Sequence, residues 1–185
     1  MKVVVHELTE GLWPAIEELF STTGPVGRCW CMYWRIGPTY RRRPPDSNKE
    51  DFHRVVAQGP PPGLVALDQH VAIGWCQLTL RTDLPALERN PKLGPVDETP
   101  VLAISCLYVR KGYRRSGVTS ALIEAAVDDA RRVGAPAIEA YPLDAKLSQS
   151  STHTGYASTF ERLGFQMVAR HAAARPIMRL DLTAD

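Results

Sequence analysis

The chain has 185 residues and a mass of 20.5 kDa, which allows one domain with a substantial hydrophobic core. Apolar residues make up 44% and charged residues 23%, and these ordinary values exclude a disordered, collagen-like or coiled-coil chain. The 22 basic residues against 20 acidic ones leave a net charge of +2. Basic and aromatic residues do not interleave, so no nucleic-acid partner is expected.

Membrane-spanning and secretory patterns are also missing from the sequence. No segment reaches the ~18 uninterrupted apolar residues that a bilayer span requires, and the N-terminal apolar run is too short for a secretory signal. Four cysteines are too few for a disulfide scaffold, and Cys29 and Cys31 have no second ligand pair at zinc spacing. We therefore expect a cytoplasmic protein with free thiols, no membrane partner and no metal.

Hydrophobic periodicity predicts an alternation of strands and helices. Short runs rich in β-branched residues indicate strands, and apolar residues three and four positions apart indicate amphipathic helices. Strands are expected at residues 3–5, 64–67, 71–80, 101–109, 137–140, 165–169 and 177–182. Helices are expected around residues 12–20, from the N-cap Ser47 to about residue 58, at 117–133 and at 156–163.

The segments between these elements have patterns of their own. The Gly-Pro-Val-Gly stretch at 24–27 is predicted to break the first helix, and Ser47 with Glu50 three residues later is typical of a capping box. Residues 81–100 hold four prolines and are predicted to form a long loop, a type of segment that is often functional. Residues 101–109 are nearly all apolar, as in a central strand buried on both faces.

Together these elements predict one α/β domain over residues 1–185. We expect a mixed, mostly antiparallel sheet of six or seven strands flanked by about four helices. The strands at 101–109 and 137–140 should be parallel neighbours, because a helix joins them and a parallel pair needs such a crossover.

One turn carries chemistry. Residues 107–122 run from the buried strand through a basic, glycine-containing turn directly into an amphipathic helix. The first turn of a helix presents unpaired backbone N–H groups and a partial positive charge, which together suit a phosphate. Gly117 permits a close approach, while Arg114 and Arg115 add charge. Neither a P-loop nor a dinucleotide glycine motif is present. The turn indicates a phosphate cradle, with a solvated surface turn as the alternative.

At these residues the sequence resembles the GNAT superfamily of acyl-coenzyme A-dependent N-acyltransferases. The family signature is an arginine or glutamine, a glycine three residues later and a small residue two further on. Residues 114–119 (RRSGVT) match it except at Thr119, which is β-branched. The strand before, the helix after and the later segment FERLGF at 160–165 follow the family's order and spacing. The resemblance covers residues 101–169, and the rest of the chain by element order.

The resemblance implies acetyl-coenzyme A (acetyl-CoA) as the acyl donor, although the pattern does not distinguish acetyl from longer acyl groups. The pyrophosphate would lie on the amides from Arg115 to Ser120. The pantetheine arm would lie along the central strand, where that strand splays from the one at 137–140. The implied coenzyme-binding residues are Leu107, Tyr108, Val109, Arg114, Arg115, Ser116, Gly117, Val118, Thr119 and Ser120.

The catalytic residues of the family are only partly matched. Relatives commonly protonate the leaving thiolate with a tyrosine in the late helix, where this chain has Phe160. Tyr156, one turn earlier, is the nearest replacement, and simple core packing is its alternative. The glutamate of many relatives falls at Ala103 or Ser105, and Ser105 could order a water. Nothing in sequence near Cys106 would lower its pKa, so direct attack in a ternary complex is expected rather than an acyl-enzyme.

The expected acceptor is a primary amine of a small molecule. Its pocket should be walled by residues 28–40, 81–100 and 171–175, with the aromatic cluster Trp30, Tyr33 and Trp34 serving either the pocket or the core. Candidates to hold a cationic acceptor are Asp83, Glu88, Asp97 and Glu98, with plain surface charge as the alternative.

Two further points stay open at this level. His153, where relatives often carry an asparagine, is a candidate pantetheine contact or a solvated histidine. A catalytically silent acyl-CoA-binding sensor is the alternative to an enzyme, because the expected tyrosine and glutamate are missing. The sequence is compatible with a monomer or a homodimer.

Overall fold

The computed structural model describes residues 2–21, 24–145 and 153–182. Among these, seven strands form one sheet in the order β1-β2-β3-β4-β5-β7-β6. The strands are β1 (Val3–Glu7), β2 (Gly63–Asp68), β3 (Val71–Leu80), β4 (Val101–Val109), β5 (Ala137–Ala140), β6 (Gln166–Ala172) and β7 (Arg175–Asp181). Among these seven described strands, β4 and β5 are the one pair that runs parallel, as predicted, and α6 (Val118–Arg132) joins them.

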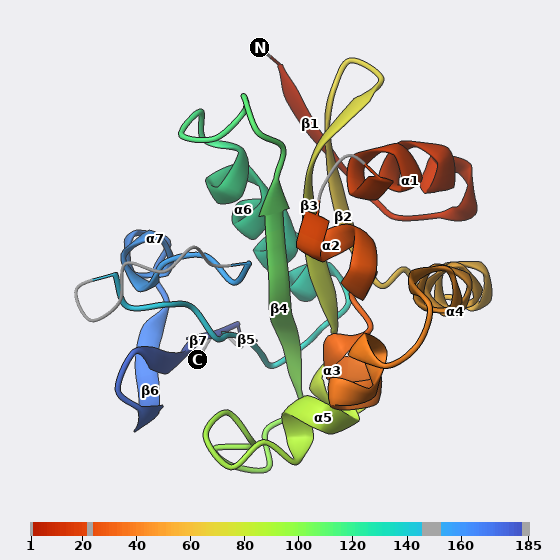
Figure 1. Ribbon diagram of the computed structural model, residues 1–185. Coiled ribbons are helices and arrows are strands. Elements are labelled where there is room, and N and C mark those ends of the chain that lie inside the picture. Colours follow the sequence, from red (N-terminus) through yellow and green to blue (C-terminus); the bar gives the residue numbers. More distant parts are fainter. Residues whose placement is uncertain (1, 22–23, 146–152, 183–185) are drawn as a thin grey trace.

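Helices cover both faces of the sheet (Figure 1). They are α1 (Trp13–Ser21), α2 (Gly24–Cys29), α3 (Tyr33–Ile36), α4 (Pro45–Gln58), α5 (Pro85–Glu88), α6 and α7 (Ala157–Arg162), with 3-10 turns η1 (Glu10–Leu12), η2 (Gly37–Arg41) and η3 (Arg81–Asp83). None of the helices in the described residues is long and apolar enough to cross a membrane.

Alternation along the strands sends side chains into two main cores. Leu64 and Ala66 of β2 pack with α6, whereas Val65 and Leu67 pack with α1 and α4. Gly74 of β3 lets α6 approach closely, because a Cβ there would lie 2.8 Å from Val118 Cγ1. A third cluster, which includes Leu84 and Leu87, packs the loop between β3 and β4 against the sheet. The sheet is thus a fixed platform for β4, whose carboxyl end leads into the basic turn.

Three local predictions need correction. Helix α1 ends at Ser21, before the 24–27 stretch, but that stretch is itself helical: it opens α2, where Pro25 stands in the first turn and needs no amide partner. Helix α4 begins at Pro45, so Ser47 lies within its first turn and is not the N-cap. The predicted loop at 81–100 contains η3 and α5.

Candidate active site

The turn between β4 and α6 has an unusual backbone. Gly112, Arg115 and Gly117 adopt positive φ angles of 100°, 63° and 87°. Gly117 is the N-cap of α6 and supplies no side-chain cap, and the first turn of α6 carries no acidic residue. The first amides of this 15-residue helix therefore face outward without a side-chain acceptor. A Cβ at Gly117 would meet nothing within 4 Å, so the space above the helix end is open.

A groove of about 890 Å³ runs from this turn along β4. Three cations line it, Arg114, Arg115 and Arg162, and no carboxylate among the described residues does. Leu107, Tyr108, Val109, Tyr113, Gly117, Val118, Thr119, Ser120, His153, Gly155, Tyr156 and Thr159 complete the lining. Of the ten residues predicted for the coenzyme, nine line this groove. The exception is Ser116, whose hydroxyl donates to the carbonyl of Tyr113 within the turn.

A β-bulge at Ser105 reshapes the middle of β4. Gln77 of β3 pairs with Cys106 and Leu78 pairs with Ile104, which leaves Ser105 without a partner across the ladder. A bulge bends its strand and re-aims the neighbouring side chains. Pairing of β4 with β5 ends at Ile104 and Ala140, directly before the bulge. The two parallel strands therefore separate where the bulge lies.

The chain itself enters the space between the separated strands. The N–H of Leu107 donates to the carbonyl of His153, and the N–H of Leu143 donates to the carbonyl of Gly155 at 2.9 Å. Leu143 also bridges to Tyr156 in parallel. Residues 153–156 thus form one wall of the groove beside β4. A coenzyme arm placed there would run next to this wall.

A second cavity, of about 500 Å³, adjoins the groove. Its walls come from the three predicted segments together with β3 and β4. The lining residues are Cys29, Cys31, Tyr33, Trp34, Tyr40, Arg41, Gln77, Asn90, Lys92, Leu93, Ser105, Cys106, His153, Thr154, Ala172 and Arg175. The predicted aromatic cluster divides, because Trp30 is buried in the core and stacks on Trp13 with ring centroids 5.7 Å apart.

Ser105 and Gln77 form a buried polar pair in the wall of this cavity. The Ser105 hydroxyl donates to Gln77 Oε1 at 3.0 Å, and Gln77 Nε2 donates to the carbonyl of Cys31 at 3.3 Å. The hydroxyl hydrogen of Ser105 is thus engaged, and its oxygen can only accept from a donor in the cavity. Ala103, the other predicted strand position, is buried in the third core cluster and does not line the cavity. Sequence reasoning missed Gln77, whose signal was an amide within an apolar strand.

Phe160 in α7 and Tyr156, the residue before this helix, lie in different surroundings. Phe160 is fully buried and packs edge-on against Phe165, with ring centroids 5.1 Å apart. Tyr156 precedes the first residue of α7, has extended backbone angles, is 39% exposed and lines the groove. It therefore does not share a helical face with Phe160 in the way the sequence spacing suggested. The side chain of Tyr156 thus belongs to the groove and not to the core.

His153 lies where the groove and the cavity meet, because it lines both. Its ring stacks on Tyr108, with centroids 6.2 Å apart. Burial lowers the pKa of His153, and the charge of Arg114 lowers it further. The imidazole is therefore neutral near pH 7 and can accept a proton at the boundary between the two spaces.

Three thiols line the cavity, and two of them are held in the protonated form. Burial raises the pKa of Cys29 to about 12 and also raises that of Cys31, whose sulfur accepts a hydrogen bond from Trp75 at 3.0 Å. A protonated thiol is a poor nucleophile and a poor metal ligand. In the described part of the chain, no cluster of three or more ligating side chains is arranged for a metal ion.

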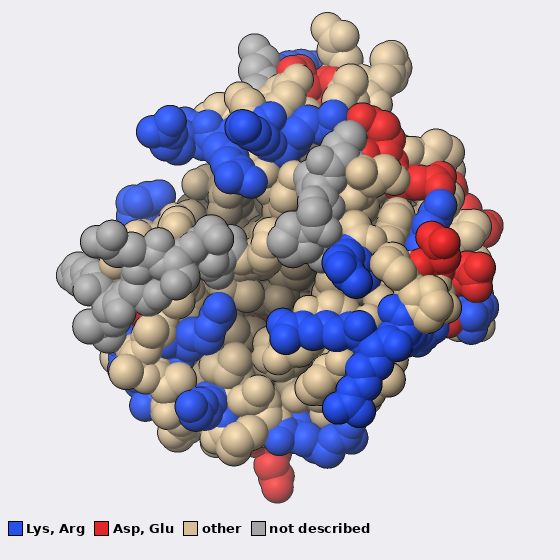
Figure 2. Space-filling model, viewed as in Figure 1, with Lys and Arg blue, Asp and Glu red and all other residues tan. Residues whose placement is uncertain are grey.

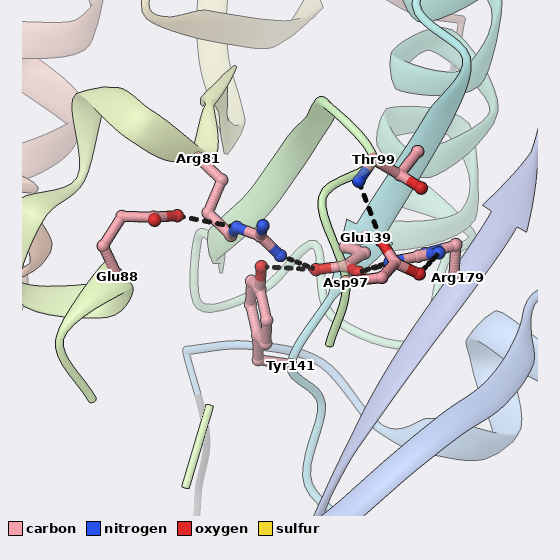
Figure 3. A network of polar contacts seen from close by, with 7 residues as sticks. All are labelled: Arg81, Glu88, Asp97, Thr99, Glu139, Tyr141 and Arg179. Carbon is pink, nitrogen blue, oxygen red and sulfur yellow. Dashed lines mark hydrogen bonds and ion pairs between the residues drawn. The ribbon is translucent and has the colours of Figure 1, made fainter. Parts of the chain in front are cut away.

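None of the four acidic candidates lines the cavity. Glu88 pairs with Arg81 at 2.7 Å, and Asp97 receives two hydrogen bonds from Arg179 at 2.6 and 3.0 Å. Both arginines converge on Glu139 of β5 (Figure 3). This network ties the loop between β3 and β4 to the sheet, because Glu88 and Asp97 belong to that loop. Glu88 and Asp97 therefore have structural partners, and the charges that line the cavity are others.

The family profile of the acetyltransferase (GNAT) family matches residues 13–165 of the chain. A comparison with curated proteins gave no match. Solved structures with the same fold include the PaiA N-acetyltransferase of Thermoplasma acidophilum bound to coenzyme A, with a TM-score of 0.58 and 15% identity over 98% of this chain and 99% of that one. YncA of Salmonella typhimurium, solved with acetyl-CoA, has a TM-score of 0.58 and 14% identity over 100% and 96%. A chain of the NatC complex bound to a Gag peptide and CoA has a TM-score of 0.58 and 16% identity over 99% and 100%.

Proposed function

The chain belongs to the GNAT acetyltransferase family, and from this premise we propose that it transfers an acetyl group from acetyl-CoA to the primary amine of a small acceptor. The observation that carries the proposal is the junction of two spaces along β4. Leu107, Tyr108 and Val109 line the groove, whereas Ser105 and Cys106 line the cavity. A thioester at this junction would meet an amine that enters from the cavity.

The groove has the chemistry that the donor requires. The pyrophosphate would accept hydrogen bonds from the first amides of α6, and the dipole of that helix favours its charge. Arg114 and Arg115 in the turn and Arg162 in α7 add positive charge around the same space. The pantetheine arm would then run along β4 toward Ser105. Coenzyme A complexes of PaiA and YncA, which share this fold, support the placement.

The reaction then follows as direct attack in a ternary complex. The amine nitrogen bonds to the thioester carbonyl carbon, the C–S bond breaks, and the thiolate leaves. Ser105 would accept a hydrogen bond from the amine or from a water and so orient it. His153, neutral and on both spaces, would take the proton that the amine loses. Tyr156 in the groove would protonate the thiolate sulfur.

Two of the three cavity thiols support direct attack over a covalent acyl-enzyme. An acyl-enzyme needs a thiolate, and burial keeps Cys29 and Cys31 protonated. Two observations favour the alternative of a silent acyl-CoA sensor. Phe160 stands where relatives carry a tyrosine, and no carboxylate among the described residues lines the cavity as a base. Neutral His153 can serve as the base in place of the missing carboxylate, so the second observation does not exclude catalysis.

The test combines calorimetry with a turnover assay. Titration of the protein with coenzyme A measures the affinity of the groove, and release of free thiol from acetyl-CoA measures transfer across a panel of amines, amino acids and peptides. We expect binding together with amine-dependent thiol release, and mass spectrometry should find the acetylated amine. Tight coenzyme binding with no release on any amine would favour the sensor. If the protein neither binds coenzyme A nor releases thiol, the placement of the donor in the groove is wrong.

A further inference from the structure

The charges around the cavity differ from those on the rest of the molecule. Arg41, Lys92 and Arg175 line it, and no Asp or Glu among the described residues does. The described ion pairs involve Arg43, Lys49, Arg54, Arg81, Arg110, Arg131, Arg132, Arg170 and Arg179, so none of them includes a cavity cation. Figure 2 shows Lys and Arg side chains around a hollow on this face, with Asp and Glu mainly along one edge of the view.

Arg175 is the most buried of the three cations. One of its terminal nitrogens, Nη1, donates to the carbonyl of Tyr141 at 3.2 Å and to Thr154 Oγ1 at 2.9 Å, and both acceptors are neutral. Burial lowers the pKa of this guanidinium, and no described carboxylate pairs with it. A guanidinium has five N–H donors in a planar fork, and a carboxylate can accept two of them side by side. Taking such a charge out of water is costly unless an anion meets it.

The position of Arg175 places that anion near the point of transfer. Thr154, which binds Arg175, follows His153 in sequence, and His153 lines both spaces. A carboxylate held by Arg175 would therefore sit close to an amine at Ser105. In an α-amino acid the amine and the carboxylate are attached to the same carbon, which fits this geometry. Lys92 and Arg41 extend the positive field to the rest of the cavity.

The opposite side of the cavity is aromatic. Tyr33 and Trp34 lie with ring centroids 4.4 Å apart, and Tyr40 meets Tyr33 edge-on at 5.5 Å. The volume of about 500 Å³ falls within the range of small-molecule sites and leaves room for an apolar or planar side chain. A cationic acceptor, by contrast, would find three like charges and no described carboxylate.

We propose that the acceptor is an amine that also carries a carboxylate or another anionic group, held by Arg175, with an apolar or aromatic body against Tyr33 and Trp34. This inference rests on the proposed acetyl transfer and names its substrate class. Its experimental consequence is a preference for amino acids over amines that lack the anion. A small anionic amine such as an aminophosphonate would satisfy the same subsite.

The test compares matched substrates in the thiol-release assay. Phenylalanine, phenylalanine amide and phenethylamine share the ring and the amine but differ in the charged group. Leucine, glutamate and 2-aminoethylphosphonate are each compared with a counterpart that lacks the anionic group. We expect at least one anionic member to exceed its anion-free partner about tenfold or more in kcat/KM, which corresponds to about 1.4 kcal/mol. Equal or better use of the anion-free members throughout would overturn the inference.

Variants locate the preference. Arg175→Gln should raise KM for the preferred anionic amine about tenfold or more, while KM for the anion-free partner changes less than about threefold. Arg89→Gln is the matched control, since Arg89 is exposed and lines neither space. An equal loss on both substrates would assign Arg175 to structure and refute the inference.

A binding measurement separates this inference from the proposed function. If coenzyme A binds but no amine releases thiol, the proposed transfer fails. The inference is then decided by tryptophan fluorescence, with Trp34 in the cavity wall as reporter. Quenching by phenylalanine or another anionic amine of the panel supports the anion subsite if it is absent in Arg175→Gln and absent with the anion-free partner. Absence of quenching with every anionic member refutes it.

Discussion

Gly117 offers the sharpest test of the phosphate cradle. Its φ angle of +87° is one that side chains rarely adopt, so Gly117→Val should cost about 1–3 kcal/mol in backbone strain. For a chain of this size, that loss lowers Tm by roughly 2–12 °C and leaves the protein folded. The added side chain meets no protein atom within 4 Å at its Cβ, because the space there is open. If that space holds pyrophosphate, coenzyme A affinity should fall at least about tenfold, or about 1.4 kcal/mol.

Gly134 supplies the matched control. It has a φ angle of +71°, a Cβ there would also meet nothing within 4 Å, and it lines neither the groove nor the cavity. Gly134→Val should therefore lose a similar amount of stability by thermal melting and keep its coenzyme affinity by calorimetry. If both variants melt alike and bind coenzyme A with the affinity of the unmodified protein, the pyrophosphate does not lie over Gly117.

Three further outcomes test the proposed chemistry. Tyr156→Phe removes only a hydroxyl, so turnover should fall by about a hundredfold with coenzyme affinity unchanged. Ser105→Ala should lower turnover by a smaller factor. A Tyr156→Phe rate within about threefold of the unmodified enzyme would leave water as the proton donor to the thiolate. Folding disfavours protonated His153, so the contribution of His153 to stability is complete above pH ~6.5 and declines as the pH falls toward its lowered pKa. His153→Gln should therefore flatten this part of a Tm-against-pH profile. An unchanged slope would contradict the lowered pKa of His153. Intact mass after acid quenching of enzyme with acetyl-CoA should reveal no acetylated protein, whereas an acetyl adduct on a cysteine would refute direct attack.

Much of the fold was predictable because buried faces of helices and strands require apolar residues at regular spacing in the sequence. The apolar run at 101–109 and the three- and four-residue spacing in α6 predicted the parallel pair and its crossover, and both were confirmed. The turn that we propose as the cradle was located from sequence as well, because its Gly117, its two arginines and the start of α6 are contiguous in sequence. The helix α2 was not, since Gly24 and Pro25 at a helix start have the same composition as a helix break.

The cavity was less accessible to sequence reasoning. A bulge at Ser105 changes which side chains of β4 face the cavity, and a single serine in an otherwise apolar strand does not reveal a change of register. The cations Arg41, Lys92 and Arg175 come from three segments that are distant in sequence, so no local pattern indicates that they line the same cavity. Asp97 was a candidate for holding a cationic acceptor, with surface charge as the alternative, because its partner Arg179 lies 82 residues away in sequence. Pairing in three dimensions decides which charges remain for a ligand.

The buried carboxylate Glu139 shows how such pairing supports the site, and it provides the last prediction. Glu139 is 0% exposed and accepts hydrogen bonds from Arg81, Arg179 and Tyr141 at 2.7 to 3.1 Å. Glu139→Gln keeps the size but points amide hydrogens at arginine donors, so it leaves buried charge uncompensated. Breaking such a pair costs about 3–5 kcal/mol, or roughly 6–20 °C in Tm.

The damage should be confined to the acceptor side. Through Arg81 and Arg179, Glu139 holds the loop that carries Lys92 in the cavity wall, whereas the groove at α6 has no contact with this network among the described hydrogen bonds. We therefore expect Glu139→Gln to raise the acceptor KM and to leave coenzyme A affinity unchanged. Glu124→Gln, on the exposed face of α6, should have a free energy of unfolding within about 0.5 kcal/mol of that of the unmodified protein. If Glu139→Gln melts like Glu124→Gln, the network does not fix the loop, because a buried charge that can be removed without cost holds nothing in place.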